Sequence, residues 1–90
     1  MAETNTPGRK PHVVFYTKSG CHLCEEAKRE IARAKCVRDY TFEEVDIETD
    51  PDLKRRFGWE IPVVTINGAV AFKHKLKAED FRQAVKRVAN

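Results

Sequence analysis

The chain has 90 residues, 17 lysines and arginines against 14 aspartates and glutamates, and a formal net charge of +3. This length suits one small domain with a modest core, and the weak positive charge does not by itself predict nucleic-acid binding. No apolar run approaches the ~18 residues of a membrane span, and the first residues lack the apolar stretch of a secretory signal. We therefore expect a cytoplasmic protein without nucleic-acid or membrane partners.

The first half of the chain predicts a strand, a helix and a second strand. Residues 1–11 are polar and broken by prolines and a glycine, which is typical of a disordered leader before a single domain over residues 12–90. Residues 12–17 are β-branched and aromatic, which indicates a strand buried on both faces. A helix is expected over residues 22–37 and a strand over residues 41–47. The helical stripe comprises Leu23, Ala27, Ile31, Ala34 and Val37.

The second half predicts a helix, a hairpin and a last helix. Asp50 and Pro51 are placed to cap and begin a short helix that ends at Gly58. Asn67-Gly68 is a strong signal for a type I′ hairpin. The elements around it are strands at 61–66 and 69–72 and a helix at 78–89. The predicted order is βαβαββα, an α/β fold with a four-stranded mixed sheet flanked by helices, in which the first two strands form a parallel crossover.

Two cysteines, Cys21 and Cys24, lie three positions apart between the first predicted strand and the first helix. A helix start leaves unpaired N–H groups and a partial positive charge, and both favour an anion. Thiolate is the reactive form of cysteine, and such a site can lower a thiol pKa from ~8.5 to roughly 3.5–7.5. We expect Cys21, at the N-cap, to be the exposed nucleophile and Cys24, about one turn inside, to resolve the mixed disulfide.

The dithiol is one part of a longer pattern. Residues 16–24 read Tyr-Thr-Lys-Ser-Gly-Cys-His-Leu-Cys, and Ile61-Pro62 opens the third predicted strand. Over residues 12–89 this pattern resembles the glutaredoxin-like family of the thioredoxin fold, in the branch with a Cys-x-Leu-Cys centre. The resemblance implies a dithiol disulfide oxidoreductase of cell redox homeostasis and electron transport. Its substrate would be a protein disulfide or a glutathione mixed disulfide and its electron donor glutathione, with no bound cofactor, and we expect a monomer.

The resemblance also implies roles for the residues around the dithiol. The expected contacts to substrate or glutathione are Lys18, His22, Ile61 and Pro62. Pro62 would be cis and would face the dithiol, while the backbone of Ile61 would pair with the substrate or with glutathione. Lys18 would support the thiolate or hold a glutathione carboxylate. His22, when protonated, would stabilise the thiolate and make the disulfide more oxidising.

One departure from the family pattern leaves alternatives open. Family members that bind glutathione usually carry a Gly-Gly pair and an acid after the second hairpin strand, but residues 72–80 read Phe-Lys-His-Lys-Leu-Lys-Ala-Glu-Asp. A thioredoxin reductase is therefore the alternative electron donor. A non-catalytic protein- or metal-binding module, holding zinc or a shared iron–sulfur cluster, is a further alternative. A zinc site normally needs a second close pair of ligands, which the chain lacks, so we expect no metal.

Two other side chains have more than one interpretation. Cys36 lies near the end of the first predicted helix and is expected to be a small apolar filler rather than a regulatory thiol. Trp59 comes just before Ile61-Pro62 and either walls the substrate groove or seals the end of the second helix.

Overall fold

The computed structural model describes residues 10–89, so most of the expected leader, residues 1–9, lies outside the described part. Pro11 is buried, and its carbonyl accepts a hydrogen bond from the N–H of Thr41 at 2.9 Å. The elements are β1 (His12–Thr17), α1 (His22–Arg33), β2 (Thr41–Asp46), α2 (Pro51–Phe57), β3 (Val63–Ile66), β4 (Ala69–Lys73) and α3 (Ala78–Val88), with 3-10 helices η2 (Val37–Asp39) and η3 (Ile47–Thr49). The predicted order of helices and strands is confirmed.

The four strands form one mixed sheet with the order β2-β1-β3-β4. β1 and β2 are parallel, with His12 opposite Thr41, whereas β3 is antiparallel to both β1 and β4. The hairpin between β3 and β4 has left-handed backbone at Asn67 (φ 51°) and Gly68 (φ 87°), as a type I′ turn requires. Only residues 18–21 separate the end of β1 from the start of α1, and the two cysteines lie at this junction.

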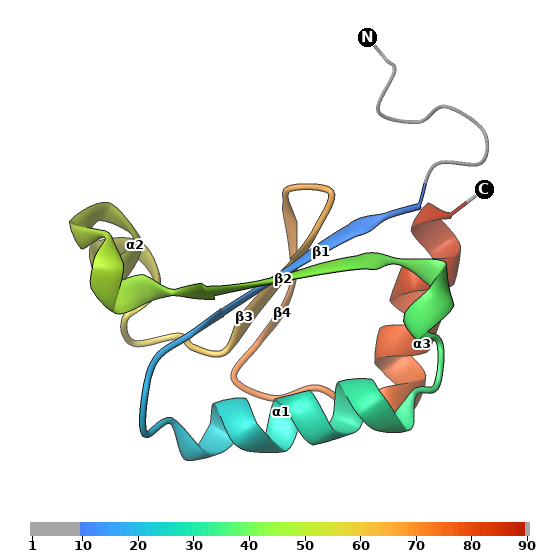
Figure 1. Ribbon diagram of the computed structural model, residues 1–90, viewed down its shortest axis with the longest axis horizontal. Helices are drawn as coiled ribbons and strands as arrows, with labels where there is room; N and C mark the ends of the chain where they lie inside the picture. Colours follow the sequence, from blue (N-terminus) through green and yellow to red (C-terminus); the bar gives the residue numbers. More distant parts are fainter. Residues whose placement is uncertain (1–9, 90) are drawn as a thin grey trace, which may run out of the picture.

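Helices cover the two faces of the sheet unequally (Figure 1). Phe81 of α3 packs against Phe72 of β4, and Phe72 lies beside Val64 in register. Phe15 shares that face, which α1 and α3 cover. Tyr16 points to the opposite face and packs against Phe57 of α2, with ring centroids 4.9 Å apart. None of the helices in residues 10–89 is long and apolar enough to cross a membrane.

The first helix ends at Arg33, four residues before the predicted end. Lys35 adopts a left-handed conformation with φ 55°, which stops the helix although the residue is neither glycine nor asparagine. Val37, expected on the buried stripe, therefore lies in η2 and is 72% exposed. Cys36 enters the core instead.

The third strand begins at Val63 rather than at Ile61. The Ile61–Pro62 peptide bond is cis, as the resemblance implies. Proline has no N–H to donate to a strand ladder, so the pairing with β1 starts one residue later, between Val63 and Tyr16. Both Ile61 and Pro62 are buried.

The second helix begins and ends as predicted. The carboxylate of Asp50 accepts hydrogen bonds from the N–H groups of Asp52 (2.9 Å) and Leu53 (3.5 Å), and Pro51 occupies the first turn. Gly58 follows the last turn with right-handed backbone, φ −53°. A Cβ at this position would lie 2.5 Å from the carbonyl oxygen of Lys54, so close approach of the backbone explains the glycine.

Candidate active site

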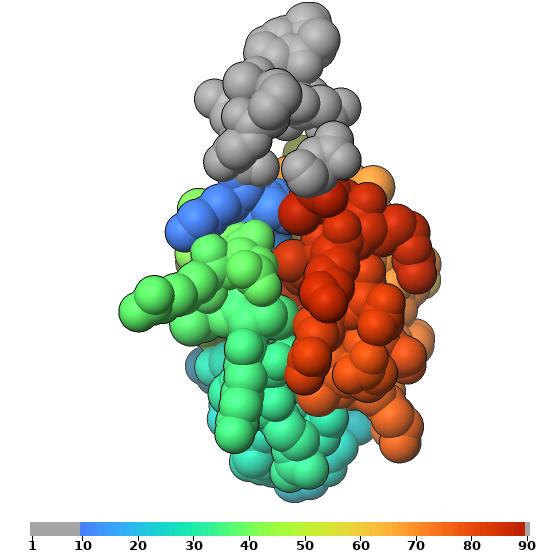
Figure 2. All heavy atoms as spheres, turned by 90° about the vertical axis from the view of Figure 1, so that its right-hand side faces the viewer, coloured from blue at the N-terminus to red at the C-terminus, as the bar shows by residue number. Residues whose placement is uncertain are grey.

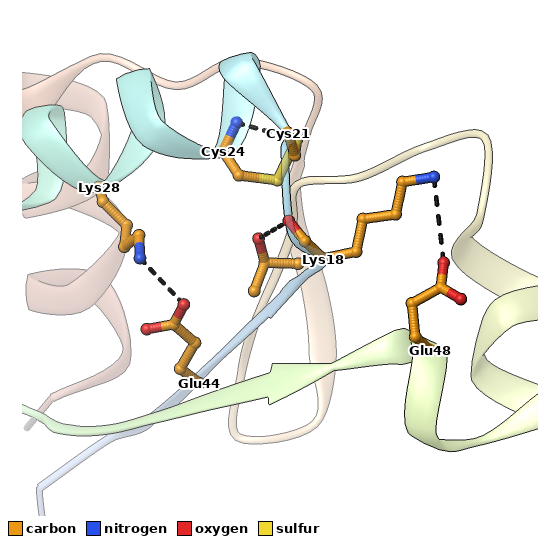
Figure 3. The surroundings of a disulfide bond; sticks show 7 residues. Lys18, Cys21, Cys24, Lys28, Glu44 and Glu48 are labelled. Carbon is orange, nitrogen blue, oxygen red and sulfur yellow. Dashed lines mark hydrogen bonds and ion pairs between the residues drawn. A yellow bond between two sulfur atoms is a disulfide. The ribbon is translucent and has the colours of Figure 1, made fainter.

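The site is built at the junction of β1 and α1. Gly20 has φ 76°, a left-handed conformation that a side chain would strain, and this turn delivers Cys21 to the N-cap of α1. Cys21 and Cys24 form a disulfide, with their Cα atoms 5.2 Å apart. Figure 3 shows the bond at the first turn of the helix. The two cysteines therefore lie at the start of a helix, as predicted.

The two sulfur atoms differ in access. Cys24 is 1% exposed and belongs to the core, whereas Cys21 is half-buried at its edge. The Sγ atom of Cys21 accepts a hydrogen bond from the N–H of Cys24 at 3.1 Å. After reduction, the same donor and the helix dipole would favour a thiolate at Cys21, because both stabilise negative charge there. The geometry suits Cys21 for attack on an external disulfide.

Lys18 points away from the disulfide, toward η3 (Figure 3). Its Nζ atom lies 4.0 Å from a carboxylate oxygen of Glu48, and the other carboxylate oxygen is 3.2 Å from Nζ of Lys54. Glu48 thus lies between two ammonium groups, those of Lys18 and Lys54. The sequence reasoning missed Glu48, because nothing in the sequence shows a contact between residues 30 positions apart.

His22 lies on the outer surface of the first turn of α1. Its side chain is 81% exposed, and its Nε2 atom is 3.1 Å from a carboxylate oxygen of Glu26. This pair has the i, i+4 spacing of a helical salt bridge, so Glu26 could have been found from the sequence. His22 is therefore held by Glu26 on the solvent side of the helix.

The segment before β3 carries the cis proline and an exposed indole. Trp59 is 95% exposed, so it does not seal the end of α2. Together with Lys18, Lys54 and Gly58 it lines a small hollow of about 180 Å³. The carbonyl of Pro62 accepts a hydrogen bond from the N–H of His74 at 2.8 Å, which anchors the end of β4 to this segment. A place for Trp59 in the wall of a substrate groove stays a prediction.

The basic run after β4 lies beside the dithiol helix. Lys73 pairs with Glu60 at 3.1 Å. Lys75 and Lys77 line a groove of about 270 Å³ together with Leu23, which stands between the two site cysteines. Two lysines of the segment that lacks the Gly-Gly pair therefore line a groove next to the first turn of α1.

The third cysteine, Cys36, is buried in the core, as expected of a small apolar filler. Burial raises the pKa of its thiol above the ordinary value, and the charge of Asp39 raises this pKa further. Burial likewise raises the pKa of the Tyr40 hydroxyl above 10.0. Both groups favour their neutral forms in the folded protein.

These shifts predict a loss of stability at alkaline pH. The unfolded chain releases these two protons at a lower pH than the folded protein does, so the free energy of unfolding should decrease as the pH rises above about 9. Urea unfolding of the oxidised protein at pH 8 and pH 10 measures this decrease. The Cys36→Ala variant should show a smaller decrease, and an equal decrease in the variant would show that Cys36 contributes nothing.

Potential metal ligands are dispersed in the described part of the chain. Among residues 10–89, no three histidine, cysteine, aspartate or glutamate side chains lie close enough together to hold a metal ion. The dithiol therefore has no third ligand beside it within one subunit of this part of the chain.

Comparison with known proteins places this geometry in a family. Residues 12–86 match the family described as the Glutaredoxin-like domain (DUF836). The chain belongs to this family. A curated relative, the glutaredoxin-like protein YDR286C homolog of Dictyostelium discoideum, is 32% identical over a match of 72% of this chain and 66% of that protein. The chain thus spans about two thirds of the length of that relative.

Solved structures similar to this glutaredoxin-like domain have the thioredoxin fold. The X-ray structure of protein XcR50 from X. campestris matches with a TM-score of 0.72 and 24% identity, over 83% of this chain and 96% of that one. The crystal structure of chloroplastic thioredoxin z matches with a TM-score of 0.71 and 16% identity, over 90% of this chain and 80% of that one. At these identities the matches establish the thioredoxin fold.

Family and geometry together indicate a redox function. The chain is glutaredoxin-like, and its Cys21–Cys24 disulfide stands at the helix start where a thiolate is stabilised. Of the expected contact residues, Lys18 adjoins the hollow beside Trp59, and His22 lies on the first turn of α1. Ile61 and Pro62 form the buried segment that leads into β3.

Proposed function

We propose that this glutaredoxin-like domain is a dithiol oxidoreductase that reduces disulfides of proteins or mixed disulfides of glutathione. The Cys21 thiolate attacks one sulfur of the substrate disulfide, forms a mixed disulfide and releases the other half as a thiolate. The thiolate of Cys24, after loss of its proton to solvent, attacks the Cys21 sulfur. The Cys21–Cys24 disulfide forms, the second half of the substrate leaves, and two electrons have passed to the substrate.

The observation that carries this proposal is the disulfide at the N-cap of α1, in which Cys21 is partly exposed and Cys24 is buried. The difference in exposure supports this order of the two steps, because Cys21 is partly exposed to an external disulfide whereas Cys24 is buried. The first turn of α1, which joins the two cysteines, keeps the resolving sulfur within bonding reach of the mixed disulfide. The arrangement therefore supports exchange that ends with substrate release.

A single-turnover reaction tests the proposal. The reduced protein is mixed with one equivalent of a glutathione mixed disulfide on a peptide, and the products are separated by mass. We expect one peptide thiol to be released per protein and the Cys21–Cys24 disulfide to form in the same amount. Persistence of both reactants over hours, with the protein folded, would contradict the proposal.

We also propose an electron donor for the dithiol, and glutathione is our first choice. Ile61, which would pair with glutathione, makes no backbone hydrogen bond within residues 10–89, so a ligand that paired with it would displace no existing backbone partner. Lys18 could hold a carboxylate if it left Glu48, because the separation of 4.0 Å is long for an ion pair between exposed groups. The lack of the Gly-Gly pair in residues 72–80 is what keeps a thioredoxin reductase as the second candidate.

A side-by-side assay separates the two donors. Turnover of the mixed disulfide is followed with glutathione and glutathione reductase in one cuvette, and with a thioredoxin reductase in another, both by consumption of reduced nicotinamide cofactor. Turnover in the first cuvette alone supports glutathione. Turnover only with thioredoxin reductase would rule out glutathione as the electron donor, while the proposed dithiol chemistry would stand.

The Glu48→Gln variant tests the proposed contact of Lys18 with glutathione. Removal of the carboxylate frees Lys18 and Lys54 for an incoming anion, so the KM for glutathione should fall about two- to fivefold, the scale of an exposed ion pair. Glu43→Gln removes a similar carboxylate beside His12, at the other end of β1, and should leave KM unchanged. Equal KM values in all three proteins would remove Lys18 from the glutathione site.

A further inference from the structure

A separate cavity lies at the other end of α1 from the dithiol. Its volume is about 860 Å³, and its lining comes from the C-terminal half of α1, from η2 and from the start of β2. Figure 2 looks at the end of the molecule where the last turns of α1 and the green segment that follows it lie beside α3. The volume falls within the roughly 300–1,000 Å³ typical of small-molecule sites.

The base of this cavity is apolar. Ile31 and Tyr40 are buried in it, and Phe42 packs against the Tyr40 ring with centroids 6.3 Å apart. Val37 and Phe42 remain 72% and 42% exposed. The left-handed turn at Lys35 is what leaves Val37 outside the core. Covering these two side chains would remove apolar surface from water, which favours a ligand with an apolar body.

The rim of the cavity carries an excess of positive charge. Lys35 and Arg38 border it and make no ion pair within residues 10–89, whereas Lys28 is held by Glu44 at 3.0 Å. Asp39 is the one acidic side chain in the lining. Within the described residues, the rim therefore has two unpaired cationic side chains and one carboxylate, a balance that favours an anionic head group.

The titratable groups at the base do not oppose such a ligand. Burial raises the pKa values of Cys36 and Tyr40, so both are neutral near pH 7 and add no negative charge to the base. The base is thus uncharged as well as apolar, and charge is confined to the rim.

We propose that this cavity binds a small free amphipathic carboxylate, with its hydrocarbon part on Val37 and Phe42 and its carboxylate at Lys35 and Arg38. This binding site is independent of the proposed redox function, because it uses neither the dithiol nor the residues expected to contact glutathione. Its occupant is a dissolved small molecule, chosen for the charge complementarity of the rim and the size of the hollow.

Titration with decanoate tests the site on the whole oxidised protein. Amide chemical shifts are followed by NMR, with decanol and decylamine as chemical controls of equal chain length. We expect saturable shifts that centre on residues 31–42 with decanoate, weaker binding of decanol, and no such shifts with decylamine. Arg38→Glu should weaken decanoate binding on the order of tenfold, because it replaces an attractive charge with a repulsive one.

Two variants keep the test sharp. Arg29→Glu makes the same change of charge on α1, but at the groove beside Leu23, and should leave decanoate binding unchanged. Val37→Asp alters an exposed side chain, so the fold should persist while binding is lost. Equal affinity of decanoate for Arg38→Glu and Arg29→Glu would overturn the proposal. So would an absence of saturation below the concentration at which decanoate forms micelles, or binding only to anionic lipid vesicles.

Discussion

Replacement of Cys21 by serine is expected to lower the rate of disulfide reduction by at least about 100-fold. A serine hydroxyl is neutral at pH 7 and cannot form the mixed disulfide, so the first step has no nucleophile. Cys24 cannot substitute for it, because this residue is only 1% exposed. The measurement is the turnover of a mixed disulfide with whichever donor supports the parent protein.

The chain provides its own control for this variant. Cys36→Ser removes a thiol that is buried outside the dithiol site, and at low temperature, where the variant remains folded, it should keep the parent rate within about twofold. A rate in Cys21→Ser equal to that of the parent would refute the mechanism. If only Cys36→Ser lost activity, our account would have assigned the attack on the substrate to the wrong cysteine.

Replacement of Phe81 by alanine is expected to lower the free energy of unfolding by about 3–5 kcal/mol. Phe81 is fully buried where α3 meets the sheet. Its ring stands perpendicular to that of Tyr40, with centroids 5.3 Å apart, and packs against Phe72. The total free energy of unfolding of a small domain is about 5–15 kcal/mol, so this change should leave the variant marginally folded at 25 °C.

Urea unfolding followed by far-UV circular dichroism measures this loss. Val88→Ala shortens an apolar side chain on the same helix that is 38% exposed, and should cost less than about 1 kcal/mol. Similar losses of unfolding free energy in the two variants would mean that the packing of α3 on the sheet contributes less to stability than expected.

Local signals in the sequence predict most of the fold. The apolar centre of residues 12–17, the Asp50-Pro51 helix start and the Asn67-Gly68 turn act over a few residues, and each appears in the structure. The dithiol is predictable for the same reason, since its position between a strand and a helix follows from adjacent residues. Features of this kind depend on backbone geometry rather than on distant packing.

The predictions from sequence fail where the folded structure overrides a local pattern or where no local pattern exists. Lys35 ends α1 in a left-handed conformation without the glycine that usually marks it, so the apolar spacing wrongly extended the helix to Val37. The contact of Lys18 with Glu48 joins β1 to the segment after β2, and only the folded sheet brings them together. Trp59, like Val37, shows that an apolar residue near an element end has no assured place in the core.

The most direct test of the central claim is the site at which a mixed disulfide is trapped on the Cys24→Ser variant. Without the resolving thiol, the adduct formed by attack on a glutathione disulfide should persist, and peptide mass spectrometry can locate it. The account predicts glutathione on Cys21, with Cys36 unmodified because its thiol is buried and neutral. An adduct on Cys36, or none on a folded protein, would contradict the assignment of Cys21 as the attacking residue.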